Sequence, residues 1–144
     1  MYNEDSIHLL KECNAGTKMA ISSINEVKDK VKDKELGTLL AYFLKEHEVI
    51  ENKTHKKLAL DNDTDKEPNP IAQVMSWAKI NAKLLIDPTD KEIAELMIDG
   101  CNMGIKSVSR YMNQYPTAVQ EVQTLTEDLV KLEQHFMDSL RRYL

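Results

Sequence analysis

The chain has 144 residues, of which 42% are hydrophobic and 30% are charged, and it contains only four glycines and four prolines. One domain can hold a sizeable core at this length, and the balance of apolar and charged residues is typical of long amphipathic helices rather than of sheets or disorder. The formal net charge of −5 argues against a nucleic-acid-binding surface, which needs basic residues to neutralise phosphates.

A first helical hairpin is predicted over residues 5–60. Apolar or small residues recur at steps of three and four from residue 5 to about 31, and a second stripe runs from residue 36 to about 60. The polar break Lys32-Asp33-Lys34 is short, so the two helices should be antiparallel. The stripes contain Leu10, Cys13, Thr17, Ala20, Ile24, Val27 and Val31, then Leu36, Leu40, Phe43, His47, Ile50 and Thr54.

Residues 61–88 are predicted to form a crossover between two hairpins. The stretch from Asp61 to Pro70 is polar and is broken by two prolines, so it is interpreted as a linker. A short helix is expected over residues 71–86, ending at Asp87-Pro88.

A second hairpin is predicted over residues 89–144. Thr89 followed by Glu92 is a capping-box pattern that begins its first helix, which must stop before Pro116. Thr117 with Gln120 repeats the capping signal for the last helix. The stripes contain Ile93, Met97, Cys101, Ile105, Val108 and Met112, then Val122, Leu125, Leu129, Leu132, Phe136, Leu140 and Tyr143.

The two hairpins are similar in sequence. The segment Cys13-Asn14-Ala15-Gly16-Thr17-Lys18 matches residues 101–106 at four of six positions, at an offset of 101 − 13 = 88. The same offset pairs His47 with His135 and gives ten identities among 56 aligned pairs, where random pairing gives roughly three or four. We therefore predict an internal duplication, the alternative being chance matching between helices of similar composition.

Two hairpins joined by a long crossover are the topology of the ferritin-like bundle. With its duplicated segment and paired histidines, the chain resembles a divergent member of the ferritin-like (rubrerythrin-type) superfamily over essentially its whole length, and it is similar to uncharacterised bacterial bundle families. The resemblance implies an all-α fold: a single domain over residues 1–144, built as a four-helix bundle from two duplicated hairpins, with a short fifth helix in the crossover.

The resemblance also implies a di-iron site, made from one Glu on each of two helices and a Glu-x-x-His on each of the other two. This chain retains too few of those carboxylates, so we expect no conventional di-iron chemistry. The family's positions fall on His47 and His135 for the histidines, on Leu44 and Leu132 for the glutamates before them, and on Cys13 and Cys101, or one position earlier on Glu12 and Gly100, for the single carboxylates.

Cys13, His47, Cys101 and His135 are candidate ligands of one metal ion near a pseudo-two-fold axis. Two thiolates and two imidazoles suit tetrahedral zinc, and the spacing is equal in both halves because 47 − 13 and 135 − 101 are both 34. A simpler interpretation is that the cysteines are small core residues and that each histidine hydrogen-bonds across the bundle. A third interpretation is redox chemistry between the two thiols, although their apolar faces should raise the thiol pKa and reduce their reactivity.

Other polar and small residues carry weaker expectations. Gly16 and Gly104 each cost about 1 kcal/mol relative to Ala inside a helix, so the first and third long helices should approach closely there. Asn14 and Asn102 flank the stripes and are expected to hydrogen-bond across that contact. A polar cluster on the second helix could share a cation but is more typical of a solvated face, and the same holds for Glu133 with Asp138. The polar cluster consists of Glu46, Glu48, Glu51 and His55.

The two cysteines are too few for a disulfide framework, which favours a reducing compartment. The N-terminus has no basic region followed by an apolar stretch, and no apolar run is long enough to span a bilayer, so a soluble, cytoplasmic protein is expected.

No Ser-His-Asp order, Gly-rich phosphate loop or Cys-x-x-Cys motif occurs, so no enzymatic activity is predicted. We expect a structural or interaction module without a cofactor, which forms a homodimer or binds another protein and has no nucleic-acid or membrane partner. The main alternative is a metalloprotein that holds zinc or iron at the Cys/His site. An inner pocket for a small apolar ligand is a further alternative, favoured by Met75, Met97, Met103 and Met112.

Overall fold

The computed structural model describes residues 1–65 and 86–144, and its four long helices confirm the predicted all-helical class. No strand occurs among these residues. The short helix predicted over residues 71–86 falls almost entirely on residues 66–85, outside the described ranges. The long helices are α1 (Glu4–Val27), α2 (Lys34–Leu60), α4 (Asp90–Gln114) and α5 (Gln120–Leu140), with short 3-10 helices η1 (Lys28–Lys30) and η2 (Arg141–Tyr143).

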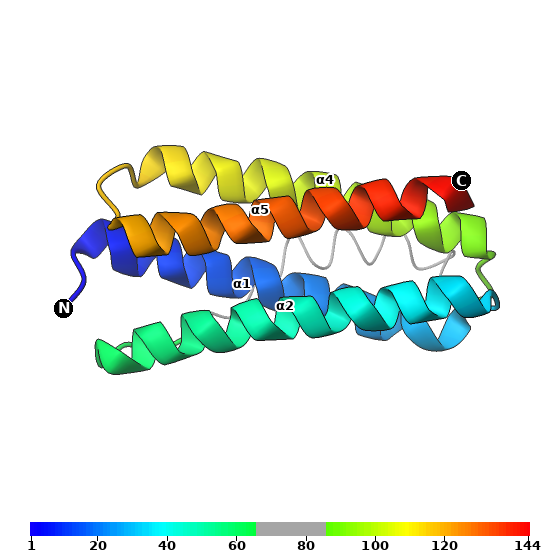
Figure 1. Cartoon of the computed structure of the whole chain (residues 1–144), viewed down its shortest axis with the longest axis horizontal. Helices are drawn as coiled ribbons and strands as arrows, with labels where there is room; N and C mark the ends of the chain where they lie inside the picture. The colour runs from blue at the N-terminus through cyan, green and yellow to red at the C-terminus, as the bar shows by residue number, and fades with distance from the viewer. Residues whose placement is uncertain (66–85) are drawn as a thin grey trace.

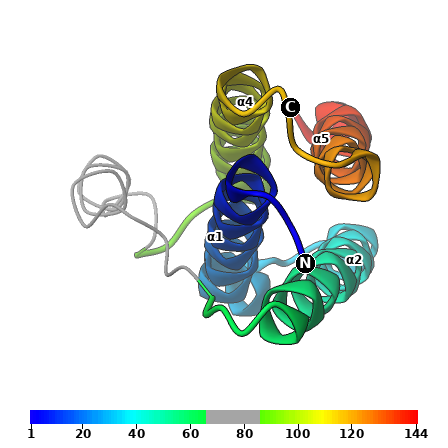
Figure 2. The same cartoon turned by 90° about the vertical axis from the view of Figure 1, so that its left-hand side faces the viewer.

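The four long helices lie side by side along the longest axis of the molecule (Figure 1). α1 and α5 run in one direction along this axis, and α2 and α4 run in the other. Viewed from the end, α1 packs beside α2 and α4, and α5 packs beside α4 and α2 (Figure 2). Within the described ranges, no helix combines the length and the apolar character that crossing a membrane requires.

Polar side chains cap the beginnings of three long helices. The Asn3 side chain accepts a hydrogen bond from the Ser6 backbone N–H, and Asp33 does the same for Leu36 at 3.0 Å. The cap predicted at Thr89 is confirmed, because its hydroxyl oxygen accepts from the Glu92 backbone N–H at 3.1 Å. Each cap satisfies a backbone donor left free by the helix geometry and contributes about 1 kcal/mol.

The cap predicted at Thr117 is wrong. α5 begins only at Gln120, after Val119, which makes no side-chain capping bond. Thr117 instead donates its backbone N–H, at 3.1 Å, and its hydroxyl, at 2.6 Å, to the carboxylate of Asp5 in α1. Asp5, which is distant in the sequence, therefore binds the Thr117 hydroxyl that the local pattern predicts as the cap of α5.

Two carboxylates tie the hairpins together at opposite ends of the bundle. Asp5, in the first turn of α1, binds the turn between α4 and α5 through Thr117. Asp90, in the first turn of α4, accepts hydrogen bonds from the backbone N–H groups of Lys32 and Asp33 in the turn between α1 and α2, each at 2.9 Å. At each end, the first turn of one hairpin is thus joined to the turn of the other hairpin.

Two apolar clusters fill the interior, and all six residues predicted for the stripe of α2 are buried. One cluster surrounds Phe43 and Phe136, whose rings stack with centroids 4.5 Å apart. The other surrounds Leu9, Val122 and Leu129. Burial of each large side chain stabilises the fold by roughly 2 kcal/mol, so these clusters supply the main driving force for packing.

The buried stripes of α2 and α5 match at an offset of 86 rather than 88. At 88, residues of opposite burial are paired: His47 is buried and His135 exposed. At 86, every pair that follows is buried on both sides. The pairs are Leu36 with Val122, Leu40 with Thr126, Phe43 with Leu129, His47 with Glu133, Ile50 with Phe136, and Thr54 with Leu140.

Candidate functional site

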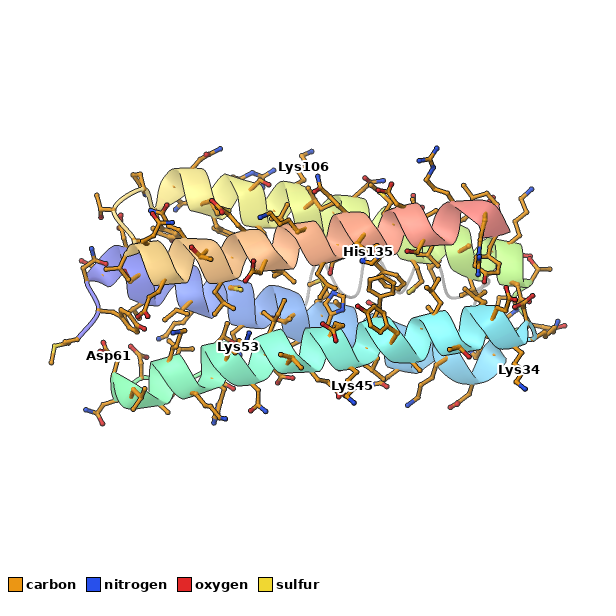
Figure 3. All side chains as sticks on the ribbon, in the orientation of Figure 1. Lys34, Lys45, Lys53, Asp61, Lys106 and His135 are labelled. Atoms are coloured by element: carbon orange, nitrogen blue, oxygen red, sulfur yellow. The ribbon has the colours of Figure 1, made fainter. Side chains whose placement is uncertain are left out.

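The four predicted metal ligands do not converge in the structure. Cys13, His47 and Cys101 are buried, but the two cysteines belong to different apolar clusters. His135 is exposed on α5, with its ring edge-on to Phe43 at a centroid distance of 5.2 Å (Figure 3). Within the part of the chain that the structure describes, no group of three or more His, Cys, Asp or Glu side chains is arranged to hold a metal ion. The equal spacing of these residues therefore does not produce a common site.

The buried polar centre is instead a pair formed by His47 of α2 and Glu133 of α5. The Nε2 atom of His47 lies 2.5 Å from Oε1 of Glu133, and the two side chains are 0% and 8% exposed. The other ring nitrogen, Nδ1, lies 2.6 Å from the backbone carbonyl oxygen of Phe43, one helical turn earlier. Both nitrogens of the buried imidazole are therefore satisfied.

This geometry fixes how many protons the pair holds. The Phe43 carbonyl oxygen can only accept, so Nδ1 of His47 carries a hydrogen and donates it. Nε2 and the Glu133 carboxyl then share one further proton, either as imidazolium with carboxylate or as imidazole with carboxylic acid. Both forms are neutral overall, which suits a buried position because an isolated charge there is costly.

The pair was not predicted, because Glu133 was assigned to a solvated face. Glu133 is buried, whereas Leu132, which the sequence pattern places on the stripe, is only partly buried. Leu129, Glu133, Phe136 and Leu140 also follow steps of four, three and four, so this stripe fits helical periodicity equally well. The available signal was a buried histidine on the facing helix, which needs a polar partner.

Cys101 of α4 is the third group at this centre. Its thiol hydrogen-bonds to Glu133, and burial together with the nearby Glu133 charge raises the pKa of the thiol well above its ordinary value. Burial likewise raises the pKa of Cys13 to about 12, although a hydrogen bond with Thr126 opposes the shift. Neither thiol readily forms the thiolate that nucleophilic or redox chemistry requires.

Gly104 and Gly16 do not mark a close approach of the backbones of α1 and α4. A Cβ atom on Gly104 would lie 3.7 Å from Oε2 of Glu133, in α5. A Cβ atom on Gly16 would meet only the side chains of Val108 and Leu129, at 3.6 and 3.7 Å. These are ordinary van der Waals distances, so the packing does not require glycine at either position. Gly16 faces Val108 of α4, whereas Gly104 faces α5 and not α1.

The two predicted asparagines also differ from each other. Asn14 is buried, and its amide donates to the Thr54 hydroxyl of α2 at 3.0 Å. Asn102 is exposed. The two asparagines therefore do not occupy equivalent environments, and the bond that the structure gives Asn14 joins α1 to α2.

The polar cluster on α2 does not form a cation site. His55 bonds through Nδ1 to Asp65 at 2.9 Å rather than turning toward Glu51, and Lys18 of α1 lies 3.2 Å from the same carboxylate. Partial burial would raise the pKa of Asp65, but the hydrogen bonds from His55 and Lys18 lower it below its ordinary value. These contacts attach the segment after α2 to α1. Glu48 is exposed, as a solvated face requires.

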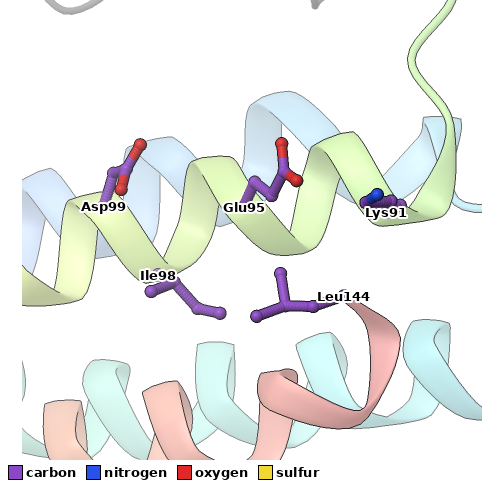
Figure 4. A pocket seen from close by; sticks show the side chains of 5 residues that line it. All are labelled: Lys91, Glu95, Ile98, Asp99 and Leu144. Carbon is purple, nitrogen blue, oxygen red and sulfur yellow. The ribbon is translucent and has the colours of Figure 1, made fainter.

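A surface pocket lies between α4 and the C-terminal residue, and it is lined by Lys91, Glu95, Ile98, Asp99 and Leu144. Ile98 and Leu144 lie next to each other, while the carboxylates of Glu95 and Asp99 point away from Leu144 (Figure 4). The polar groups lining the pocket do not converge on one point, as a specific ligand site would require. Of the methionines predicted to favour an inner pocket, Met97 is buried in a packed cluster, Met112 packs partly buried against the other cluster, Met103 is 44% exposed, and Met75 lies outside the described residues.

Comparison with known proteins adds no family to these observations: the chain matches no protein-family model, no curated protein and no solved structure.

Proposed function

We propose that this chain is a ferritin-like four-helix bundle that acts as a non-enzymatic structural or interaction module. The observation that carries the proposal is the His47–Glu133 pair, because it fills the centre of the bundle with side chains that satisfy each other. In the superfamily that the sequence resembles, inward carboxylates and histidines at this level leave room for two metal ions. Here the positions corresponding to those glutamates are Leu44 and Leu132.

Two further features support this architecture. The helix directions, with a crossover from the end of α2 to the beginning of α4, agree with a ferritin-like layout. The matching burial of α2 and α5 at an offset of 86 supports descent from one ancestral hairpin, with a change of register after duplication.

The proposal is tested by elemental analysis of the purified protein before and after incubation with zinc or iron(II), followed by dialysis. We expect no stoichiometric metal, because no group of three or more His, Cys, Asp or Glu side chains among the described residues is arranged to hold a metal ion. The variant His135→Asn, at an exposed position, controls for metal held loosely at the surface. About one equivalent of zinc or two of iron that resists dialysis would overturn the proposal.

That outcome would favour the alternative of a zinc or iron protein. The observation in favour of this alternative is that two of the four predicted ligands, His47 and Cys101, contact the same Glu133 carboxyl group. In this case Cys101→Ser should reduce metal retention, whereas Cys13→Ser, in the other apolar cluster, should not.

The partner in the proposed module is a second copy of the chain or another protein. Tyr42, Val49 and Leu60, the last residue of the helix, are the large apolar residues exposed on α2. Tyr42 and Val49 are 49% and 42% exposed, and their spacing of seven residues puts them on one side of the helix. Light scattering over a wide concentration range tests the homodimer. If the wild type dimerises through this side, Tyr42→Ser should weaken the dimer, whereas Glu48→Ser, at an exposed position about 120° away around the helix, should leave it unchanged. A monomer at every concentration excludes the homodimer.

A further inference from the structure

His47 and Glu133 lie where the two hairpins contact each other through equivalent positions. At an offset of 86, His47 and Glu133 occupy equivalent positions in α2 and α5, and they contact each other. In an arrangement with two-fold symmetry, a residue that contacts its own equivalent lies at the axis. The pair therefore marks the position at which a hairpin can distinguish the other hairpin from a second copy of itself.

The ion pairs flanking the centre do not make this distinction. Glu35 of α2 lies 3.2 Å from Arg142, and at the other end Glu121 of α5 lies 3.4 Å from Lys57. Each hairpin thus carries an acid at the beginning of its second helix and a base near its end. Two copies of the same hairpin packed in the same way would bring the same opposite charges together.

The carboxylates at the ends of the bundle do not distinguish the other hairpin from a second copy either. Asp5 accepts hydrogen bonds from the backbone N–H and the hydroxyl of Thr117, and Asp90 accepts from the backbone N–H groups of Lys32 and Asp33. Backbone donors are present in the turn of either hairpin, so each carboxylate would find one whichever hairpin it faced.

The apolar contacts also leave both pairings open. Outside the centre, the buried stripes of α2 and α5 are apolar at most equivalent positions, as Leu36 and Val122 or Ile50 and Phe136 illustrate. Hydrophobic packing follows volume and pattern and is tolerant of the identity of the partner.

We propose that the His47–Glu133 pair specifies that the α1–α2 hairpin packs on the α4–α5 hairpin and not on a copy of itself. Pairing two α1–α2 hairpins would bury His47 against His47, and pairing two α4–α5 hairpins would bury Glu133 against Glu133. Two buried imidazoles offer no carboxylate to share the proton, and two buried carboxylates repel each other. Only the mixed pair is neutral with every polar atom satisfied. The competing structure is an exchanged dimer of two chains. In this dimer the two α1–α2 hairpins pack on each other, and so do the two α4–α5 hairpins.

The proposal is tested with an intramolecular distance between spin labels on α2 and α5, introduced at the exposed positions Lys45 and Gln134. Labelled protein is mixed with an excess of the same variant without labels, so that the short distance reports only packing within one chain. Wild-type protein should give one short distance. The buried native cysteines, whose thiol pKa values are raised, should not take the label.

Three variants at the centre give the decisive comparison. His47→Glu buries two carboxylates together in every pairing, so the preference for the mixed pairing, and with it the single short distance, should be lost. Adding Glu133→His should restore it, because the order of the pair is reversed while its complementarity is kept. The leucine pair, with His47→Leu and Glu133→Leu, should stay folded, since apolar replacement of a buried pair is often neutral or stabilising. It should nevertheless form exchanged dimers that increase with concentration.

The proposal fails if the leucine pair keeps the single short distance and the wild-type mass at all concentrations. It also fails if Glu133→His does not restore the short distance that His47→Glu removed. If the leucine pair does not fold, the rescue between these two charged variants decides the matter alone.

Discussion

Removing Glu133 should destabilise the bundle far more than removing any exposed carboxylate. Glu133→Ala leaves Nε2 of His47, which is 0% exposed, without a partner and creates a cavity beside Cys101. Breaking a buried ion pair by deleting one partner costs about 3–5 kcal/mol, a large share of the roughly 5–15 kcal/mol that stabilises a typical domain. For a chain of this size we expect the melting temperature to fall by roughly 10–20 °C.

The variant Glu133→Gln separates the hydrogen bond from the charge. A glutamine amide can donate to Nε2 of a neutral His47 that keeps its Nδ1 hydrogen on the Phe43 carbonyl, so every polar atom stays satisfied. Its expected cost is about 1 kcal/mol. Urea titrations followed by far-ultraviolet circular dichroism would measure both values, with similar slopes in the linear extrapolation.

The matched control is Glu127→Ala, an exposed glutamate on the same helix, which should change stability by less than about 0.5 kcal/mol. If Glu133→Ala were as mild as this control, the buried pair would not form in solution. The reasoning about the centre of the bundle would then be refuted.

Three further outcomes are expected. Gly37→Ala and Gly100→Ala should each stabilise the protein by up to about 1 kcal/mol in urea titrations, since no atom lies within 4 Å of the added Cβ and alanine favours the helix; a loss of stability in both would contradict the packing. The Thr117 hydroxyl and backbone N–H lower the pKa of Asp5, so its stabilisation is present above the unfolded-state pKa and is lost as pH falls through the folded-state value. Asp5→Asn should therefore flatten the acid limb of a plot of stability against pH, and an unchanged limb would argue against the contact. Both cysteines should resist a thiol reagent in the native protein and react fully in urea, as a timed mass measurement would show.

The sequence predicted the helices well because their signals are local. The stripe of α2 was confirmed at every position, and the Thr89 cap was placed correctly. Both depend on residues within one or two helical turns of each other, where spacing alone determines which side chains share a face.

The errors arose where a distant residue decides between two local solutions. In α5, stripes through Leu132 and through Glu133 both fit the helical period, and apolarity favoured Leu132; only His47, 86 residues away, makes burial of Glu133 acceptable. The cap at Thr117 failed in the same way, because Asp5 takes its donors. Neither partner is visible in a local pattern.

The four predicted metal ligands do not converge for a related reason. Identity at an offset of 88 suggested that His47 and His135 are equivalent, but burial relates the second helices at 86. A shift of two residues turns a helical side chain by about 200°, to the opposite face. His135 consequently faces solvent while its sequence counterpart lies in the core.

The carboxylates Asp5 and Asp90 have a mechanical consequence for the molecule. Helical bundles commonly loosen from their tips, where the last turns have few neighbours. Here, peeling the first turn of α1 away also releases the turn between α4 and α5, and peeling α4 releases the turn between α1 and α2. The tips of the molecule therefore open only in concert with the opposite hairpin, so fraying at either end is coupled to separation of the two halves.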